Sequence, residues 1–144
     1  ERIKAAVDAR NRLAPDFVLT ARSEAPVRTD DNLRETIKRL QAFADAGADC
    51  VYAPGLIEKQ HIEAVLAEVP APLNILAGRK NFHLTRKELE DMGVTRVSIG
   101  SGLARIAFGA FTAAAESLKD SGSFGCFDRE EGMEDFDLFM KGRL

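Results

Sequence analysis

The stretch DFVLTARSEA, residues 16–25, decides how this chain folds. Its first half is an apolar run, which is typical of a strand buried on both faces of a sheet. Its second half contains Arg22 and Glu24, and side chains two residues apart on a strand point to the same side. We therefore expect a buried strand that ends in a pair of opposite charges.

The position of this charged pair gives it two possible roles. In a parallel α/β sheet or barrel, ligands bind at the carboxyl ends of the strands. The Arg22 guanidinium offers a fork of N–H donors that suits a carboxylate or a phosphonate. An ion pair that faces solvent and binds nothing is the alternative. The charges alone leave both roles open.

Outward from this stretch, the chain alternates between predicted helices and strands. Helices are expected at residues 1–13, 32–46, 58–69 and 103–119, with a short one between Thr85 and Gly93. Further strands are expected at residues 50–53, 73–77 and 96–100. The spacings of Asn32 to Glu35 and of Thr85 to Glu88 predict capping boxes at two helix starts.

Strict alternation of buried strands with helices indicates a parallel sheet covered by helices. Four strand–helix units fit either an open doubly wound sheet or half of an eight-fold barrel. A complete barrel takes about 250 residues, and this chain has 144. We expect residues 1–122 to form the second half of a (β/α)8 barrel of TIM type. Residues 123–144 are expected to be a tail that docks on a partner subunit or on its own barrel.

Composition excludes several other classes of protein. The net charge of −3 and the lack of a dense basic cluster argue against nucleic-acid binding. No apolar run reaches the roughly 20 residues that a membrane-spanning helix needs. Two separated cysteines are too few for a disulfide framework or a zinc site. A reducing, cytoplasmic location is the simplest interpretation.

Four segments together resemble one family. These are FVLTARSEA at residues 17–25, AGAD at 46–49, PLNI at 72–75 and GVTRVSIG at 93–100. In this order they resemble the isocitrate lyase/phosphoenolpyruvate mutase superfamily, and the resemblance extends over residues 1–124. It implies an eight-stranded barrel of which this chain supplies about the last four strand–helix units.

The resemblance also implies a chemistry. Members make or break C–C or C–P bonds next to a 2-oxo acid, and Mg²⁺ holds the oxo acid and stabilises an enolate. Arg22 is then the catalytic and substrate-binding arginine that grips the anionic group of a small substrate. Glu24 matches the acid that orients this arginine. Asn74 has the parity of a residue inside the barrel, where a polar side chain is either hydrogen-bonded locally or near a ligand, so it is a candidate substrate contact.

Two departures from the family pattern limit the expectation. The metal ligands and the gating loop belong to earlier strands of the family barrel, so the chain alone is expected to be incomplete and inactive. Pro54 stands where the tricarboxylate lyases have a glutamate, which favours a simpler 2-oxo acid or phosphonate. An oxaloacetate-type decarboxylase or phosphonopyruvate hydrolase is the alternative on this scaffold. A non-catalytic binding or assembly module is the alternative from another class.

Three other features have a possible role near the strand ends. Arg79 and Lys80 lie in the loop after the third strand and are candidate attractors of an anion. The turn at residues 98–102 is placed where barrels often bind phosphate, but its glycines are also typical of close packing, which we favour. Tyr52 is expected in the core.

The last helix and the tail predict an interface. The helix is rich in alanine, and the tail adds Phe124, Phe127, Phe136 and Phe139, more apolar area than a solvated terminus exposes. By resemblance to the family, in which the last helix packs into a neighbouring subunit, we expect a homo-oligomer, dimer or tetramer. A tail folded back over its own barrel is the alternative.

Overall fold

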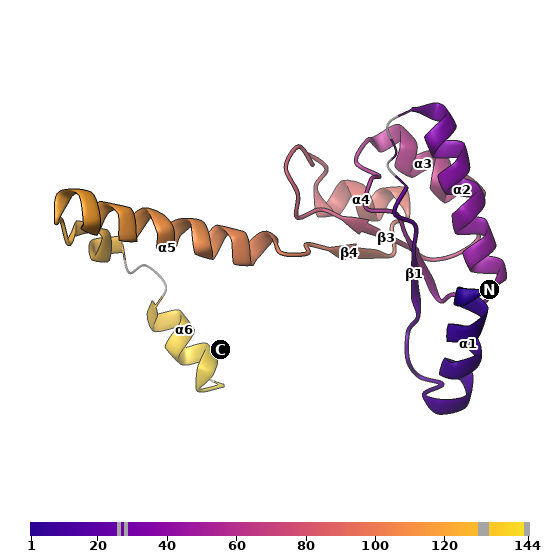
Figure 1. Cartoon of the computed structure of the whole chain (residues 1–144), viewed down its shortest axis with the longest axis horizontal. Coiled ribbons are helices and arrows are strands. Elements are labelled where there is room, and N and C mark those ends of the chain that lie inside the picture. Colours follow the sequence, from indigo (N-terminus) through magenta and orange to yellow (C-terminus); the bar gives the residue numbers. More distant parts are fainter. Residues whose placement is uncertain (26, 28, 130–132, 143–144) are drawn as a thin grey trace. The chain divides into compact units, whose positions relative to one another are not determined.

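The structure is a computed structural model that describes residues 1–25, 27, 29–129 and 133–142. It divides into two compact units, Glu1–Gly102 and Leu103–Leu144. Each unit is described by itself below, and Figure 1 gives the labels of the elements. The predicted boundary after residue 122, between the half-barrel and the tail, stays a prediction.

The first unit alternates strands and helices as predicted (Figure 1). Its elements are α1 (Arg2–Leu13), β1 (Thr20–Arg22), α2 (Asp30–Asp45), β2 (Cys50–Tyr52), α3 (Lys59–Glu68), β3 (Leu73–Leu76), α4 (Arg86–Met92) and β4 (Arg96–Ser98). Every predicted helix and strand of this unit is present. The strands are shorter than predicted. The apolar runs in the sequence extend beyond the residues that form backbone hydrogen bonds with a neighbouring strand.

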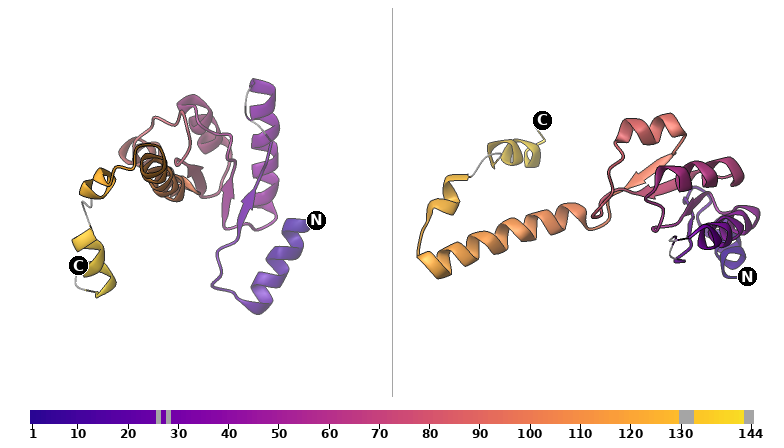
Figure 2. Two further views of the ribbon diagram at one scale, coloured as in Figure 1. Left: turned by 60° about the vertical axis from the view of Figure 1, so that its left-hand side comes forward. Right: turned by 90° about the horizontal axis from the view of Figure 1, so that it is seen from above.

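The sheet is parallel throughout, in the order β1-β2-β3-β4. Residues of β2 and β3 pack in one hydrophobic cluster with residues of α2, α3 and α4, so these helices cover one face (Figure 2). Sequential order with the helices on one face is the winding of a barrel, whereas a doubly wound sheet reverses its order and has helices on both faces. The predicted TIM-type architecture is confirmed.

The core lies between the sheet and these helices. Its fully buried apolar side chains come from both strands and helices, as parallel β/α packing requires, and one comes from the loop after β2. The largest of them are Leu40, Val51, Leu56, Ile62, Val65, Leu73, Ile75 and Leu89.

The first half of the stretch at residues 16–25 differs from the prediction. Phe17 and Val18 are exposed, and β1 begins only at Thr20. The expectation of a strand buried on both faces is wrong here because β1 is an edge strand that pairs only with β2 among the described residues. The backbone N–H of Leu19 donates to the Asp49 carboxylate at 2.8 Å, which fixes the entry to the strand.

One predicted helix cap is wrong and the other is confirmed. Helix α2 begins one turn early because the Thr29 hydroxyl accepts the N–H of Asn32 at 3.3 Å, so Asn32 lies inside the helix. At α4, Thr85 and Glu88 form the predicted reciprocal capping box. Gly93 ends that helix with φ of 93°, in the left-handed region.

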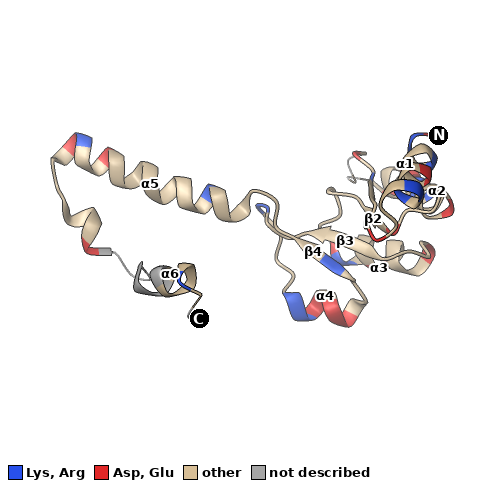
Figure 3. Ribbon diagram, turned by 90° about the horizontal axis from the view of Figure 1, so that it is seen from below, with Lys and Arg blue, Asp and Glu red and all other residues tan. Residues whose placement is uncertain are grey.

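The second unit contains α5 (Gly102–Ser121), a 3-10 helix at Gly125–Arg129 and α6 (Met133–Met140). The predicted helix at residues 103–119 is confirmed. No residue of α5 is buried, and Figure 3 shows only scattered charges along it. Within the part of the chain that the structure describes, no helix is both long and apolar enough to cross a membrane.

Candidate functional site at the carboxyl ends of the strands

Strand β1 ends in the predicted pair of charges. Arg22 Nε forms an ion pair with Glu24 Oε1, and Arg22 Nη2 donates to Glu24 Oε2 at 3.1 Å. The Arg22 guanidinium carbon lies 5.1 Å from the centroid of the Tyr52 ring, within cation–π range. The prediction that Arg22 and Glu24 share one side is confirmed. Their role in binding a ligand stays a prediction.

The pair remains accessible to a ligand. The Arg22 side chain is 50% exposed and that of Glu24 is 71% exposed. An exposed ion pair contributes only about 0–1 kcal/mol to stability. The contact therefore orients the guanidinium more than it stabilises the fold. An anion that displaces Glu24 from Arg22 would lower the stability of the fold only slightly.

The register of the sheet places Arg22 in a row with three other residues. Arg22 is opposite Tyr52, Tyr52 is opposite Asn74, and Asn74 is opposite Arg96. Side chains in register across a sheet point to the same face, and these point away from the helix-covered core. Asn74 is thus on the face of Arg22, two strand spacings or about 10 Å away.

Asn74 is buried and only partly hydrogen-bonded. It is 1% exposed, and its Nδ2 donates to Ser98 Oγ at 3.0 Å. Ser98 Oγ in turn donates to the Ile75 carbonyl at 3.4 Å. Asn74 Oδ1 has no partner in the described residues. A buried acceptor without a donor costs about 1–3 kcal/mol, so this atom is suited to accept from a ligand.

Close contacts connect the loop after each strand to the loop after the neighbouring strand. A Cβ on Gly55 would lie 2.9 Å from the backbone N of Val27, so the loops after β1 and β2 approach at backbone distance. Arg79 Nη1 donates to the carbonyl of Pro54, which joins the loops after β2 and β3. A Cβ on Gly78 would lie 1.9 Å from the carbonyl oxygen of Ile99, which only glycine permits.

The joined loops enclose a small pocket of about 280 Å³. It is lined by residues from the ends of three neighbouring strands, in the position where parallel barrels bind ligands. These residues are Glu24, Ala25, Val27, Pro54, Gly55, Ile57 and Arg79.

The glycine turn after β4 is a packing feature. A Cβ on Gly102 would lie 3.4 Å from Gly78, and one on Gly100 would lie 3.3 Å from the Leu76 side chain. The turn after β4 thus fits closely against the turn after β3. This contact supports the packing interpretation over a phosphate site.

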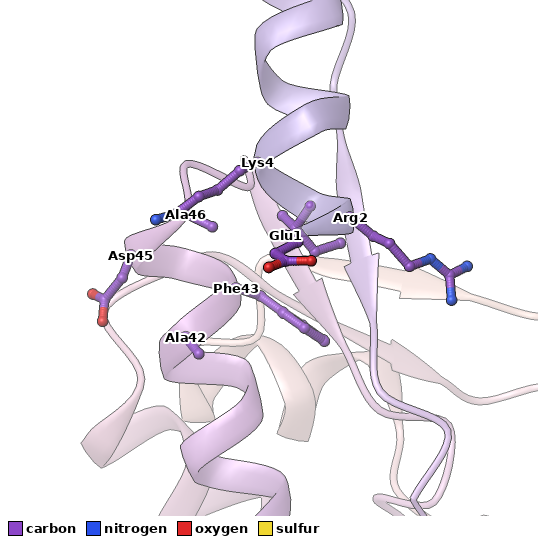
Figure 4. A pocket seen from close by; sticks show the side chains of 8 residues that line it. Glu1, Arg2, Lys4, Ala42, Phe43, Asp45 and Ala46 are labelled. Atoms are coloured by element: carbon purple, nitrogen blue, oxygen red, sulfur yellow. The ribbon is translucent and has the colours of Figure 1, made fainter.

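A larger cavity, about 670 Å³, lies between the first turn of α1 and the end of α2 (Figure 4). Its charged side chains do not converge, since those of Arg2 and Asp45 point to opposite sides. Its residues from α2 lead into the amino end of β2, whereas ligands of parallel barrels bind at the carboxyl ends. The smaller pocket is therefore the candidate site.

The described side chains do not form a Mg²⁺ site. Among them, no group of three His, Cys, Asp or Glu is placed to hold a metal ion. Cys50 is buried on the Arg22 face, and its burial raises the pKa of the thiol, so it is not a reactive thiolate at neutral pH.

Two contacts of the site were not predicted from the sequence. Tyr52 was expected in the core, but it is only partly buried and its ring lies beside Arg22. Ser98 lies in the predicted fourth strand, but its contact with Asn74 across the sheet was not predicted. Tyr52 and Ser98 lie on the same face of the sheet as Arg22. The pairing register between the strands would therefore have identified both contacts.

The fold and the site define a class: a parallel β/α barrel with an exposed arginine–glutamate pair and a pocket at its strand ends. The family model for phosphoenolpyruvate phosphomutase matches residues 1–119. The chain belongs to this family, which confirms the predicted isocitrate lyase/phosphoenolpyruvate mutase superfamily.

One curated relative is the 2-methylisocitrate lyase of Shewanella oneidensis, 36% identical over 85% of this chain and 41% of the relative. The crystal structure of a "putative lyase/mutase" from Burkholderia cenocepacia has 41% identity and a TM-score of 0.87 over 97% of this chain and 50% of that one. A 2,3-dimethylmalate lyase structure has 28% identity and a TM-score of 0.78, covering 97% and 51%. The chain thus spans about half the length of the relatives it matches.

Proposed function

We propose that the whole protein is a lyase or mutase that acts on a small 2-oxo acid or phosphonate. It makes or breaks a C–C or C–P bond through an enolate. The observation that carries this proposal is the oriented guanidinium at the end of β1, where Arg22 is held by Glu24 and faces Tyr52. Membership in a family that contains such enzymes supports it.

In this mechanism Arg22 binds the anionic group of the substrate with its N–H donors. Glu24 and the Tyr52 ring keep the plane of the guanidinium fixed before the substrate arrives, so little orientational freedom is lost on binding. When the bond breaks, negative charge collects on the oxo acid. A fixed positive group nearby lowers the free energy of that state, and Arg22 keeps its charge throughout.

Asn74 is proposed as the second substrate contact. Its Nδ2 is occupied by Ser98, which fixes the orientation of the amide and leaves Oδ1 as an acceptor. A hydroxyl or enol O–H of the substrate is the complementary donor.

Mg²⁺ remains part of the proposal as the cofactor of the whole protein. When bound, such an ion would stabilise the enolate oxygen. The described side chains do not fit it, so its ligands would have to come from other residues.

One residue narrows the range of substrates that we propose within the family. Pro54, at the end of β2, lines the pocket with a ring and a carbonyl instead of a carboxylate. This favours a small 2-oxo acid or phosphonate, and a decarboxylase or phosphonopyruvate hydrolase is the second candidate. Membership in a family of lyases and mutases favours an enzyme over a non-catalytic module.

We also propose that α5 and the tail bury against a second copy of the chain in a homo-oligomer. Their exposed apolar side chains exceed what a solvated helix usually shows; they include Leu103, Ile106, Phe108, Phe111, Phe124, Phe127, Phe136 and Phe139. Light scattering on the whole protein, with and without the residues after Gly122, tests this. A monomer in both cases at micromolar concentration would contradict it.

The catalytic proposal is tested by assaying the purified whole protein with Mg²⁺. The panel is 2-methylisocitrate, 2,3-dimethylmalate, oxaloacetate and phosphonopyruvate, and the products are followed by NMR. Turnover of at least one compound, abolished by EDTA and restored by Mg²⁺, is expected. No turnover of any compound, with folded protein confirmed by circular dichroism, would overturn the proposal.

A further inference from the structure

The charges at the strand ends are not balanced. The Arg22 charge is neutralised by Glu24, and Asn74 is neutral. Arg79, at the end of β3, makes no ion pair in the part of the chain that the structure describes, and its hydrogen bond goes to a neutral carbonyl, that of Pro54. Among the residues that line the pocket at the strand ends, Arg79 is therefore the cation without an acidic partner in the described part of the chain.

Arg79 and Glu24 line the same pocket. The pocket has a volume of about 280 Å³, and its other lining residues are small or apolar. The contact with Pro54 draws the Arg79 side chain from the loop after β3 across to the loop after β2. Since this contact uses one nitrogen of the guanidinium, the other nitrogen atoms keep their N–H donors for a ligand. The lining thus contains Glu24, which pairs with Arg22, and the Arg79 guanidinium, which has no acidic partner among the described residues.

We propose that Arg79 binds a second anionic group of the substrate, a carboxylate or a phosphonate, while Arg22 holds the first. Arg79 is then a specificity-determining residue that selects substrates with two anionic groups over those with one. This inference rests on the proposed function, because it requires Arg22 to hold a 2-oxo acid.

A purely structural role is the competing explanation. Arg79 joins two loops through Pro54, and its loss would loosen the edge of the pocket without any contact to substrate. Arg79→Gln separates the two roles, since the glutamine amide keeps an N–H donor but has no charge. Arg79→Lys has the opposite property, keeping the charge but losing the planar fork. Lys80→Gln removes a neighbouring charge that does not line the pocket and is the matched control.

The test is calorimetric titration of the whole protein, in the presence of Mg²⁺, with three ligands. Pyruvate has one anionic group, 3,3-difluorooxaloacetate has two carboxylates, and phosphonopyruvate has a carboxylate and a phosphonate. Arg79→Gln is expected to weaken binding of the dianionic ligands about 10- to 100-fold, the range for a lost hydrogen bond to a charged group. Pyruvate binding should change less than about 2-fold, and Arg79→Lys should recover part of the loss.

Each outcome of the titrations supports or overturns the role proposed for Arg79. Loss with the dicarboxylate alone assigns Arg79 to a carboxylate, and loss with phosphonopyruvate alone assigns it to a phosphonate. An equal loss for pyruvate, or no loss for any ligand, overturns the inference and leaves the proposed function standing. An equal loss with Lys80→Gln also overturns it. If the unmodified protein binds none of the three ligands, both this inference and the proposed function fail.

Discussion

Helices α2 and α5 are the two longest helices of the chain, with 16 and 20 residues, and they differ in burial. Helix α2 buries Thr36, Ile37 and Leu40, whereas α5 buries none of its residues although its apolar content is higher. Both helices form, because helix formation depends on local spacing and propensity. Burial depends on whether a partner surface is present, and only α2 packs on the sheet of its own unit.

The largest effect expected from this comparison is on the stability of the first unit. Leu40→Ala should lower the free energy of unfolding by about 2–5 kcal/mol, because Leu40 is fully buried in the core. Ile106→Ala in α5 is the matched variant, and below the concentration of assembly it should change stability by less than about 0.5 kcal/mol. Urea unfolding of both variants measures this. Equal losses would show that α5 packs within its own chain.

The second effect separates chemistry from packing in the first unit. Arg22→Lys should lower kcat/KM of the whole protein at least ~100-fold, because a point charge replaces an oriented fork. Arg39→Lys, which changes the same residue type in a surface pair with Glu35, is the control and should have no effect. Turnover near that of the unmodified protein would remove Arg22 from the site.

A smaller effect is expected at the start of α4. Thr85→Ala should cost about 1 kcal/mol of stability, because it removes the hydroxyl that caps the helix. Hydrogen bonds from the Thr85 backbone and side chain hold the pKa of Glu88 below its ordinary value of 4.5. The variant should therefore also raise the Glu88 pKa, which NMR titration measures. An unchanged pKa together with unchanged stability would contradict the capping role.

The smallest effect concerns the attachment of α1. Asp49 accepts hydrogen bonds from Arg10 and from Leu19, and the contact with Arg10 is the main cause of the lowered pKa of this carboxyl. A lowered folded-state pKa gives stability that is present above the ordinary value of 3.8 and is lost as pH falls below it. Asp49→Asn should therefore flatten the decline in stability below about pH 4. A decline as steep as that of the unmodified protein would exclude Asp49 as its source.

The sequence by itself determined the order of helices and strands, the family and the Arg22–Glu24 pair. These properties depend on local spacing: period-2 and period-3.6 apolar patterns, and two charges on one strand face. The Thr85 cap was predictable for the same reason, since its partner Glu88 is three residues away. The cap of α2 was misassigned because two candidate residues, Thr29 and Asn32, compete within one turn.

Only the tertiary structure decided which distant residues meet. Strand register placed Tyr52 beside Arg22 and Ser98 beside Asn74, and no local pattern contains the register between strands that are 20 or more residues apart. The tertiary structure also brought Arg79 to the carbonyl of Pro54, in a contact between two loops. The exposure of Phe17, Val18 and the apolar face of α5 was decided in the same way, because an apolar residue is buried only where another surface reaches it.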